Sequence, residues 1–227
     1  MNWLITFTTV TFSLLISYCV VNKERASKYR LLRLDEHSDD YVSKNFSQKY
    51  EFIILCIVTG INIVTAYYLS INSSSLLNQL KMSVSLICMS GVCVNDYREH
   101  RIPDVFPAIT ALSGMIFLMI GFITDGDNAI AYIASSALAT VVTVVSLLIV
   151  NIIVHQGIGM GDIKILAAIA LTGGVYVIIG TLFFGMVMSA VIALGLLILK
   201  KKKLDEGIPF GPFIYLGFVL TIILSLY

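Results

Sequence analysis

The sequence predicts an all-α, polytopic integral membrane protein with about eight transmembrane helices. Hydrophobic residues make up 58% of the 227 residues and charged residues only 13%, with a mean hydropathy of +0.91. A soluble domain carries about 25% charged residues, so this chain has too few to cover a surface that faces water. Its apolar residues also gather into long runs, and a helix needs about 20 such residues to cross a bilayer.

The apolar runs give the expected spans in chain order. They cover residues 2–21, 51–71, 76–94, 103–124 and 129–154, then a stretch 163–199 that holds two spans, and finally 210–226. We expect the long stretch to divide near Thr172-Gly173-Gly174, because paired glycines favour a tight turn. The sixth span, 163–171, is then short and is tilted, distorted or partly re-entrant. One long kinked helix, which gives one span fewer, is the alternative.

Basic residues set the expected orientation, because they are concentrated in cytoplasmic loops. They lie after the first, third, fifth and seventh spans: Lys23, Arg25, Lys28, Arg30, Arg33, Lys44, Lys49, Arg98, Arg101, Lys164 and the lysines at 200–203. The alternate loops hold only Lys81. All basic loops therefore share the cytoplasmic side and both termini lie outside. One span fewer would place 200–203 outside.

The chain is expected to divide into three regions. Residues 1–21 form a retained membrane anchor rather than a cleaved signal peptide, because basic residues follow this run and none precede it. Residues 22–50 form a short cytoplasmic loop that is helical in part, and 51–227 form the transmembrane core.

Composition also argues against several classes of function. Nucleic-acid binding is not expected, because no basic face lies outside the membrane loops. Cys19, Cys56, Cys88 and Cys93 all lie in apolar runs and no C-x-x-C pair exists, so the sequence predicts no metal or dithiol site. No cofactor is expected.

Two aspartates stand at the cytoplasmic ends of spans. Asp96 follows the third run, and Asp162 opens the long stretch after a glycine-rich turn. A carboxylate at a membrane boundary is costly and marks a functional site. Two close carboxylates titrate as a coupled pair. One can then take a proton from water while the other donates to a scissile carbonyl. The pair predicts an aspartic protease at the membrane edge, with glycines at 157, 159 and 161 allowing close approach and positive φ.

The same aspartates are also compatible with simpler roles. Asp162 could cap a helix that begins at Ile163, and Asp96 could pair with Arg98 or Arg101 in a loop. Asp104 is expected in the first turn of the fourth span. A transporter could use the aspartates as a proton relay, and a non-catalytic scaffold for a pilus or secretion machine would not need them.

Three ordered motifs resemble the type IV prepilin peptidases and their archaeal preflagellin relatives. Gly159-x-Gly161-Asp162 is similar to the GxGD motif of that family. Asp96 followed by Arg101-Ile102-Pro103 is similar to its other aspartate stretch. The segment 208–213, Ile-Pro-Phe-Gly-Pro-Phe, is similar to its Pro-Phe-Gly-Pro element, with Pro209, Gly211 and Pro212. The motifs span about the C-terminal two-thirds of the chain.

The resemblance implies a function. The catalytic pair is Asp96 and Asp162, while Gly159, Gly161 and Lys164 of the GxGD stretch, Arg101 and Pro103, and the Pro-Phe-Gly-Pro residues shape the site or bind substrate. The chain would cleave the basic leader of prepilins or pseudopilins after a glycine, at the cytoplasmic face of a bacterial inner membrane. It lacks the cysteine pairs and methyltransferase motif of larger members. The expected member is a compact one, of the kind found with tight-adherence pili, without zinc or N-methylation.

Overall fold

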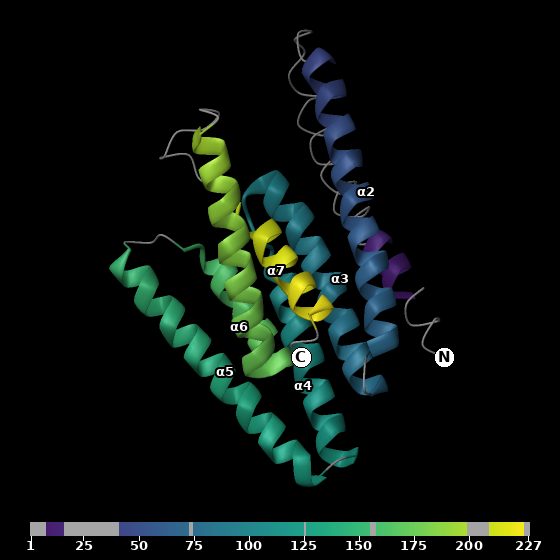
Figure 1. The fold of residues 1–227 in the computed structure, drawn as a ribbon, viewed down its shortest axis with the longest axis vertical. Coiled ribbons are helices and arrows are strands. Elements are labelled where there is room, and N and C mark those ends of the chain that lie inside the picture. The colour runs from purple at the N-terminus through teal and green to yellow at the C-terminus, as the bar shows by residue number, and fades with distance from the viewer. Residues whose placement is uncertain are drawn as a thin grey trace, which may run out of the picture.

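A computed structural model describes residues 8–15, 41–72, 75–124, 126–154, 158–198 and 209–224, without the side chains of 41–52, 126–129 and 196. All regular structure in these ranges is helical, as predicted. After the helical residues 8–15 come α2 (Tyr41–Asn72), α3 (Leu76–Glu99), α4 (Val105–Thr124), α5 (Gly126–Ile153), α6 (Met160–Ile198) and α7 (Gly211–Ile223). Figure 1 shows them as a bundle whose middle is formed by α3, α6 and α7.

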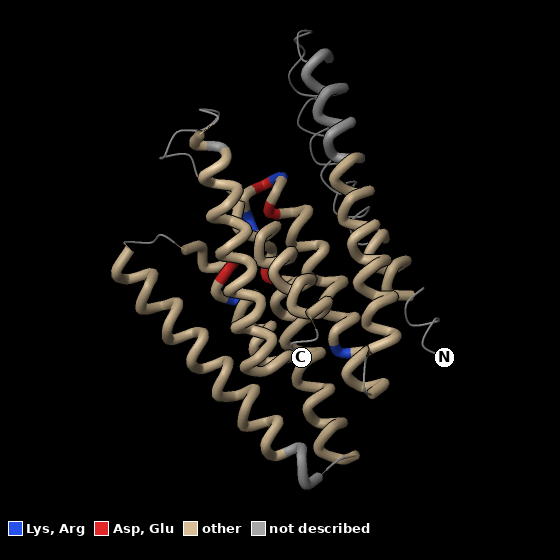
Figure 2. Tube along the Cα trace, in the orientation of Figure 1, with Lys and Arg blue, Asp and Glu red and all other residues tan. Residues whose placement is uncertain are grey.

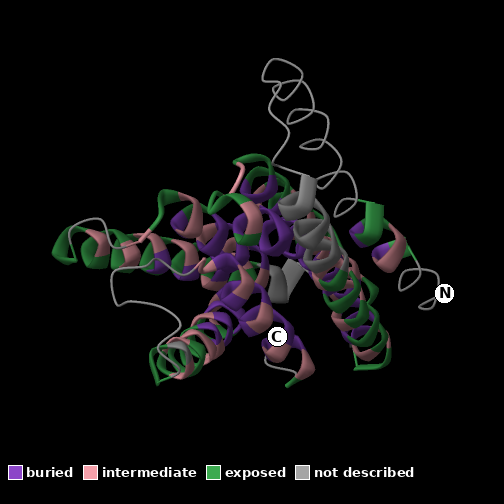
Figure 3. Ribbon diagram, turned by 90° about the horizontal axis from the view of Figure 1, so that it is seen from above, coloured by how far each residue is buried: buried purple, intermediate pink, exposed green. Residues whose placement is uncertain are grey.

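The central helix α3 is the most polar of the long helices and the most buried, with 72% of its span inside the protein. Ser75 caps its start by accepting a hydrogen bond from Asn78 N at 3.2 Å. His100 ends it in the left-handed region (φ 52, ψ 36), with its N–H donating to Asp96 O at 2.9 Å. Because its serines, glycine and cysteines are small, neighbouring helices can pack closely around it. Figure 3 shows the buried residues at the centre of the bundle.

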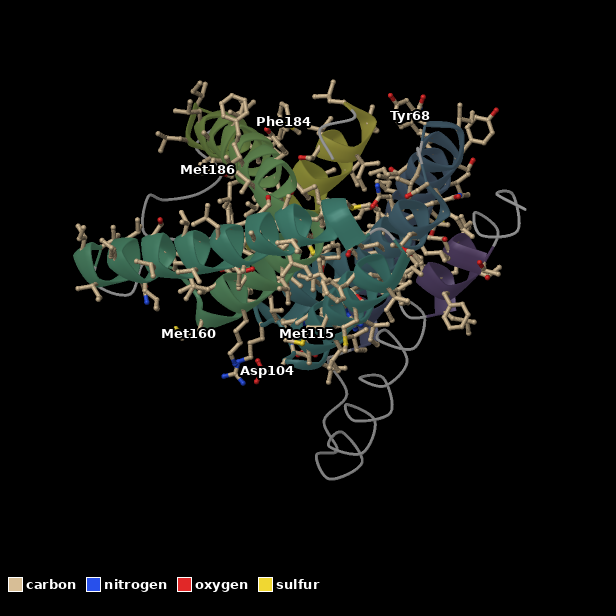
Figure 4. All side chains as sticks on the ribbon, turned by 90° about the horizontal axis from the view of Figure 1, so that it is seen from below. Tyr68, Asp104, Met115, Met160, Phe184 and Met186 are labelled. Carbon is tan, nitrogen blue, oxygen red and sulfur yellow. The ribbon has the colours of Figure 1, made fainter. Side chains whose placement is uncertain are left out.

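The outer helices present apolar surface outward. Only 28% of the α2 span, 22% of α4 and 17% of the α5 span are buried. Large exposed side chains such as Met115 on α4 and Met186 on α6 point away from the bundle (Figure 4). Exposed apolar side chains in such numbers would be unstable in water and suit a lipid surrounding. The protein is therefore a polytopic membrane protein.

The helix α6 is interrupted at Gly174, where φ is 74 and ψ is −167. The first part begins next to Ile102, since Gly161 contacts that residue. Further along, Gly180 contacts Thr221 at the far end of α7, whereas Ser189 and Ala193 lie beside Phe210 at its start. The chain therefore reverses direction at Gly174. The first part, 160–173, is only about 21 Å long at 1.5 Å per residue, against a hydrocarbon core of about 30 Å.

The short helix α7 packs very closely against the second part of α6. A Cβ atom on Gly217 would collide with Thr181 O and would lie 2.7 Å from Gly185 N. A Cβ on Gly180 would lie 2.7 Å from Thr221 Oγ1. Glycines thus let these two backbones approach as small residues do in membrane helix pairs. This contact holds α7 in the centre of the bundle (Figure 1).

Most predicted spans match observed helices, with different ends. Five helices in the described ranges are long and apolar enough to cross a membrane, α6 being counted once, and α7 is shorter. The turn predicted near Gly173-Gly174 is where the backbone leaves helical geometry. The number of crossing segments stays a prediction. α2 begins at Tyr41, inside the predicted loop 22–50, while the lysines at 200–203 lie outside the described residues.

The expectation for Lys81 was wrong. It is not a loop residue but lies inside α3, only 3% exposed. Its Nζ donates to Tyr132 Oη at 2.5 Å and lies 4.4 Å from the centroid of that ring. The long apolar stem of a lysine can be buried when its ammonium finds such a partner. The sequence showed this lysine but could not show that its partner is Tyr132 on α5.

Candidate active site

Asp96 lies in the last turn of α3 and is almost fully buried, at 6% exposure. Its Oδ2 accepts a hydrogen bond from Gly211 N at 2.7 Å. The alternative in which Asp96 is a loop charge beside an arginine is therefore wrong about its position. Arg101 is exposed and uses its backbone instead, with its carbonyl accepting from Asn95 Nδ2 at 2.9 Å.

The Asp96 carboxylate caps α7 from another helix. The residue before α7, Phe210, has no side-chain hydrogen bond to offer as a cap. Gly211 donates to Asp96, Pro212 has no N–H, and Phe213 N donates to Phe210 O at 3.0 Å. The first backbone groups of α7 are thus satisfied. A negative side chain at this position also meets the positive end of the helix dipole.

Asp162 lies in the first turn of α6 and is partly buried. The helix begins at Met160, three residues earlier than the capping alternative required, so Asp162 is not the residue before the helix. Its backbone N–H donates to Gly159 O at 3.1 Å. Its carboxyl group lies within electrostatic range of Asp96. The structure thus brings the two predicted aspartates, from α3 and α6, to one end of the bundle.

The glycines near the two aspartates allow neighbouring residues to pack directly against the backbone. A Cβ on Gly161 would lie 2.9 Å from Ile102 Cβ, and one on Gly159 would lie 3.1 Å from Asp162 Oδ2. A Cβ on Gly211 would lie 2.7 Å from Asp96 Cβ. The predicted positive φ at Gly159 and Gly161 was wrong, because Gly174 is the only described glycine with positive φ. Gly157 lies outside the described residues.

The other predicted site residues surround this end of the bundle. Lys164 Nζ pairs with Asp104 Oδ1 at 2.7 Å, both side chains being largely exposed. Asp104 precedes α4 rather than lying in its first turn. Pro103 and Pro209 are half-buried in the connections before α4 and α7, and Pro212 is half-buried in the first turn of α7. Figure 2 shows most charged residues of the described tube near the end of α3 and the start of α6, and Figure 4 shows Asp104 at the surface.

An open groove of about 310 Å³ lies beside the start of α7. Its lining comes from α6 and from the beginning of α7: Ser189, Ala190, Ala193, Phe210 and Phe213. Sequence reasoning did not identify the three small residues, because no motif marks them and they meet α7 only after the chain has reversed. Phe210 links the groove to Gly211 and hence to Asp96.

A comparison with protein families bears on this arrangement. Residues 83–194 match the model of the type IV leader peptidase family. The chain resembles a type IV prepilin peptidase over this segment. No curated protein and no solved structure matches it. The match contains Asp96, Asp162 and the helices α4 and α5, but it ends before α7. Leader peptidases are proteases, so a membrane protease is the general function of this prepilin peptidase-like chain.

Proposed function

We propose that this chain is an aspartic prepilin peptidase in which Asp96 and Asp162 together activate a water molecule. One carboxylate takes a proton from the water, and the other donates a proton to the carbonyl of the scissile peptide bond. The attack forms a tetrahedral intermediate, which collapses as the amine leaves with a proton. Two carboxyl groups that share a proton suit both halves of this reaction.

The observation that supports the proposal is the proximity of two acidic side chains from distant parts of the chain. Asp96 is buried and Asp162 is partly buried, at the same end of a membrane protein. The two carboxyl groups lie within electrostatic range of each other, and both residues lie in the segment that matches the leader peptidases. A carboxylate is costly at a membrane boundary, and catalysis gives a reason to keep two there.

The proposed substrate is a prepilin or pseudopilin, cut after a glycine that ends its basic leader. Such a substrate carries an apolar helix after the cleavage point, and the groove beside Phe210 has room for side chains of this helix next to the site. Under the proposed orientation the site faces the cytoplasm of a bacterial inner membrane. The exposed positions near the site leave it open to a peptide that arrives from that side.

The test is cleavage of a co-expressed prepilin by Asp96→Asn and Asp162→Asn variants. Asparagine keeps the shape of the side chain but cannot exchange a proton at neutral pH, so each variant is expected to lose processing completely. Asp104→Asn is a matched control, since Asp104 is exposed and pairs only at the surface. It is expected to retain activity.

Membrane levels of all three variants are measured by immunoblot alongside processing. Continued cleavage by a well-inserted Asp96→Asn or Asp162→Asn protein would exclude that carboxylate from catalysis. It would favour the scaffold or transporter alternatives for these residues. Loss of processing in both, with the control active, supports the dyad.

A further inference from the structure

A buried chain of polar side chains runs through the bundle below the site. Tyr215 Oη donates to Asn62 Oδ1 at 2.7 Å, and Asn62 Nδ2 donates to Ser13 Oγ at 2.5 Å. Ser13 Oγ lies 2.9 Å from Ser90 Oγ. These side chains come from α7, α2, the helical residues 8–15 and α3, and none is more than 2% exposed. We call these four residues the Tyr215 relay.

The hydrogen bonds of the relay have one consistent direction. Ser90 Oγ also donates to Ile87 O at 2.7 Å, so its single proton is used there and Ser13 must donate to it. Asn62 then donates to Ser13, and Tyr215 donates to Asn62. Each serine proton is used once, and the relay ends on the Ile87 carbonyl. Tyr215 Oη has a second, more distant acceptor on α2, Val58 O at 3.3 Å. A buried polar group left without its partner is costly, so these side chains fix one another.

The relay reaches the candidate active site through α7. Tyr215 and Gly211 are four residues apart, so they lie on the same face of α7 about one turn apart. Gly211 donates to Asp96 on α3, while Tyr215 is held by α2. The opposite side of α7 packs on α6 through Gly217 and Gly185. The face of α7 that carries Gly211 and Tyr215 is therefore turned toward α3 and α2, where Asp96 and Asn62 bind it.

We propose that the Tyr215 relay is a positioning device, which sets the Gly211 N–H on the Asp96 carboxylate. The proposal rests on the proposed function, since it assumes that Asp96 acts in cleavage. Residues 13 and 62, which lie outside the segment that matches the leader peptidases, would then act on the site through α7. None of the four relay residues touches the substrate in this proposal.

The test compares Tyr215→Phe with Tyr176→Phe in purified, membrane-reconstituted full-length protein. Both changes remove one hydroxyl and keep the ring, but Tyr176 is 78% exposed and points away from the core. Tyr215→Phe is expected to lower kcat for prepilin cleavage about tenfold, the loss of about one buried hydrogen bond, with KM little changed. Tyr176→Phe is expected to leave kcat and KM unchanged.

Hydrogen exchange gives a readout that does not depend on activity. Peptides that contain the Gly211 amide are expected to exchange faster in Tyr215→Phe than in wild type and in Tyr176→Phe. Ser90→Ala, a smaller change at the other end of the relay, is expected to act in the same direction. It replaces Tyr215→Phe in the comparison if that variant fails to insert.

The outcomes separate the two proposals. Unchanged exchange at Gly211 together with unchanged kcat, in a well-inserted relay variant, would overturn the positioning role while leaving the dyad intact. Cleavage by Asp96→Asn would instead overturn the dyad, whatever the exchange data show. A fall in protein level with normal kcat per molecule would reduce the relay to a structural element and would also overturn its positioning role.

Discussion

At Gly211 the backbone of α7 and the side chain of Asp96 are in direct contact, so there is no room for a Cβ atom at this position. An alanine Cβ would lie 2.7 Å from Asp96 Cβ and 2.8 Å from Asp96 Oδ2. Neither atom belongs to the far end of a long side chain, so the aspartate or the helix must move. The sequence showed a Pro-Phe-Gly-Pro element but not this contact, which joins positions 115 residues apart.

Gly211→Ala is therefore expected to reduce prepilin cleavage about 100-fold, because a displacement of about 1 Å at a catalytic group costs that much. The measurement is kcat/KM in reconstituted protein, with membrane levels checked. Gly195→Ala is the matched control, since nothing lies within 4 Å of the added Cβ. Equal activity in the two variants would show that Asp96 need not stay against Gly211.

At the scale of elements, α6 decides the architecture. Its sequence is apolar over its whole length, so hydrophobic pattern alone could not tell one long kinked helix from two shorter ones. The paired glycines at 173 and 174 indicated a turn, and the positive φ of Gly174 explains why it is needed. The combination of φ 74 and ψ −167 is accessible essentially to glycine alone.

Gly174→Ala is expected to lower the stability of the folded protein by about 1–3 kcal/mol, the cost of forcing a Cβ-bearing residue into that region. The added Cβ itself has room, since its nearest neighbour, Ser135 Oγ, is 3.4 Å away. A drop in the midpoint of thermal unfolding in detergent measures the effect. Gly195→Ala should be neutral or slightly stabilising. Equal midpoints for the two variants would argue against the strained turn.

At the scale of the whole molecule, one end of the bundle carries the chemistry. The end of α3, the start of α6 and the start of α7 meet there, while α4 ends at Thr124 on the opposite side (Figure 1). The basic loops of the sequence predict that the catalytic end faces the cytoplasm. The basic loops and the two aspartates are thus expected on the same side of the membrane. The orientation of that side toward the cytoplasm stays a prediction.

Thiol labelling can test this orientation. In a background without native cysteines, Thr124→Cys is expected to react from outside intact spheroplasts with a membrane-impermeant maleimide. Glu99→Cys, at the exposed end of α3, is expected to react only after the membrane is permeabilised. Retained prepilin cleavage checks that both variants are folded. The reverse labelling pattern would place the catalytic end outside and contradict the proposed orientation.

The sequence by itself determined the class of the protein and singled out the two aspartates as candidates for its site. Long apolar runs force helices in a bilayer, because every backbone group must be satisfied within the segment. A carboxylate at the end of such a run is unusual enough to be noticed without a structure. The glycines beside Asp162 were found as well, although their role proved to be close approach rather than positive φ.

Only the tertiary structure decided which distant residues meet. Gly211 on Asp96, Lys81 on Tyr132, and Tyr215 on Asn62 each join helices far apart in the chain. Hydrophobic pattern fixes how long each helix is, but it is nearly uniform around α6 and α7, so it does not say which faces touch. Close packing of small residues and a few buried hydrogen bonds determine which helix faces are in contact. These interactions form only once the helices have come together.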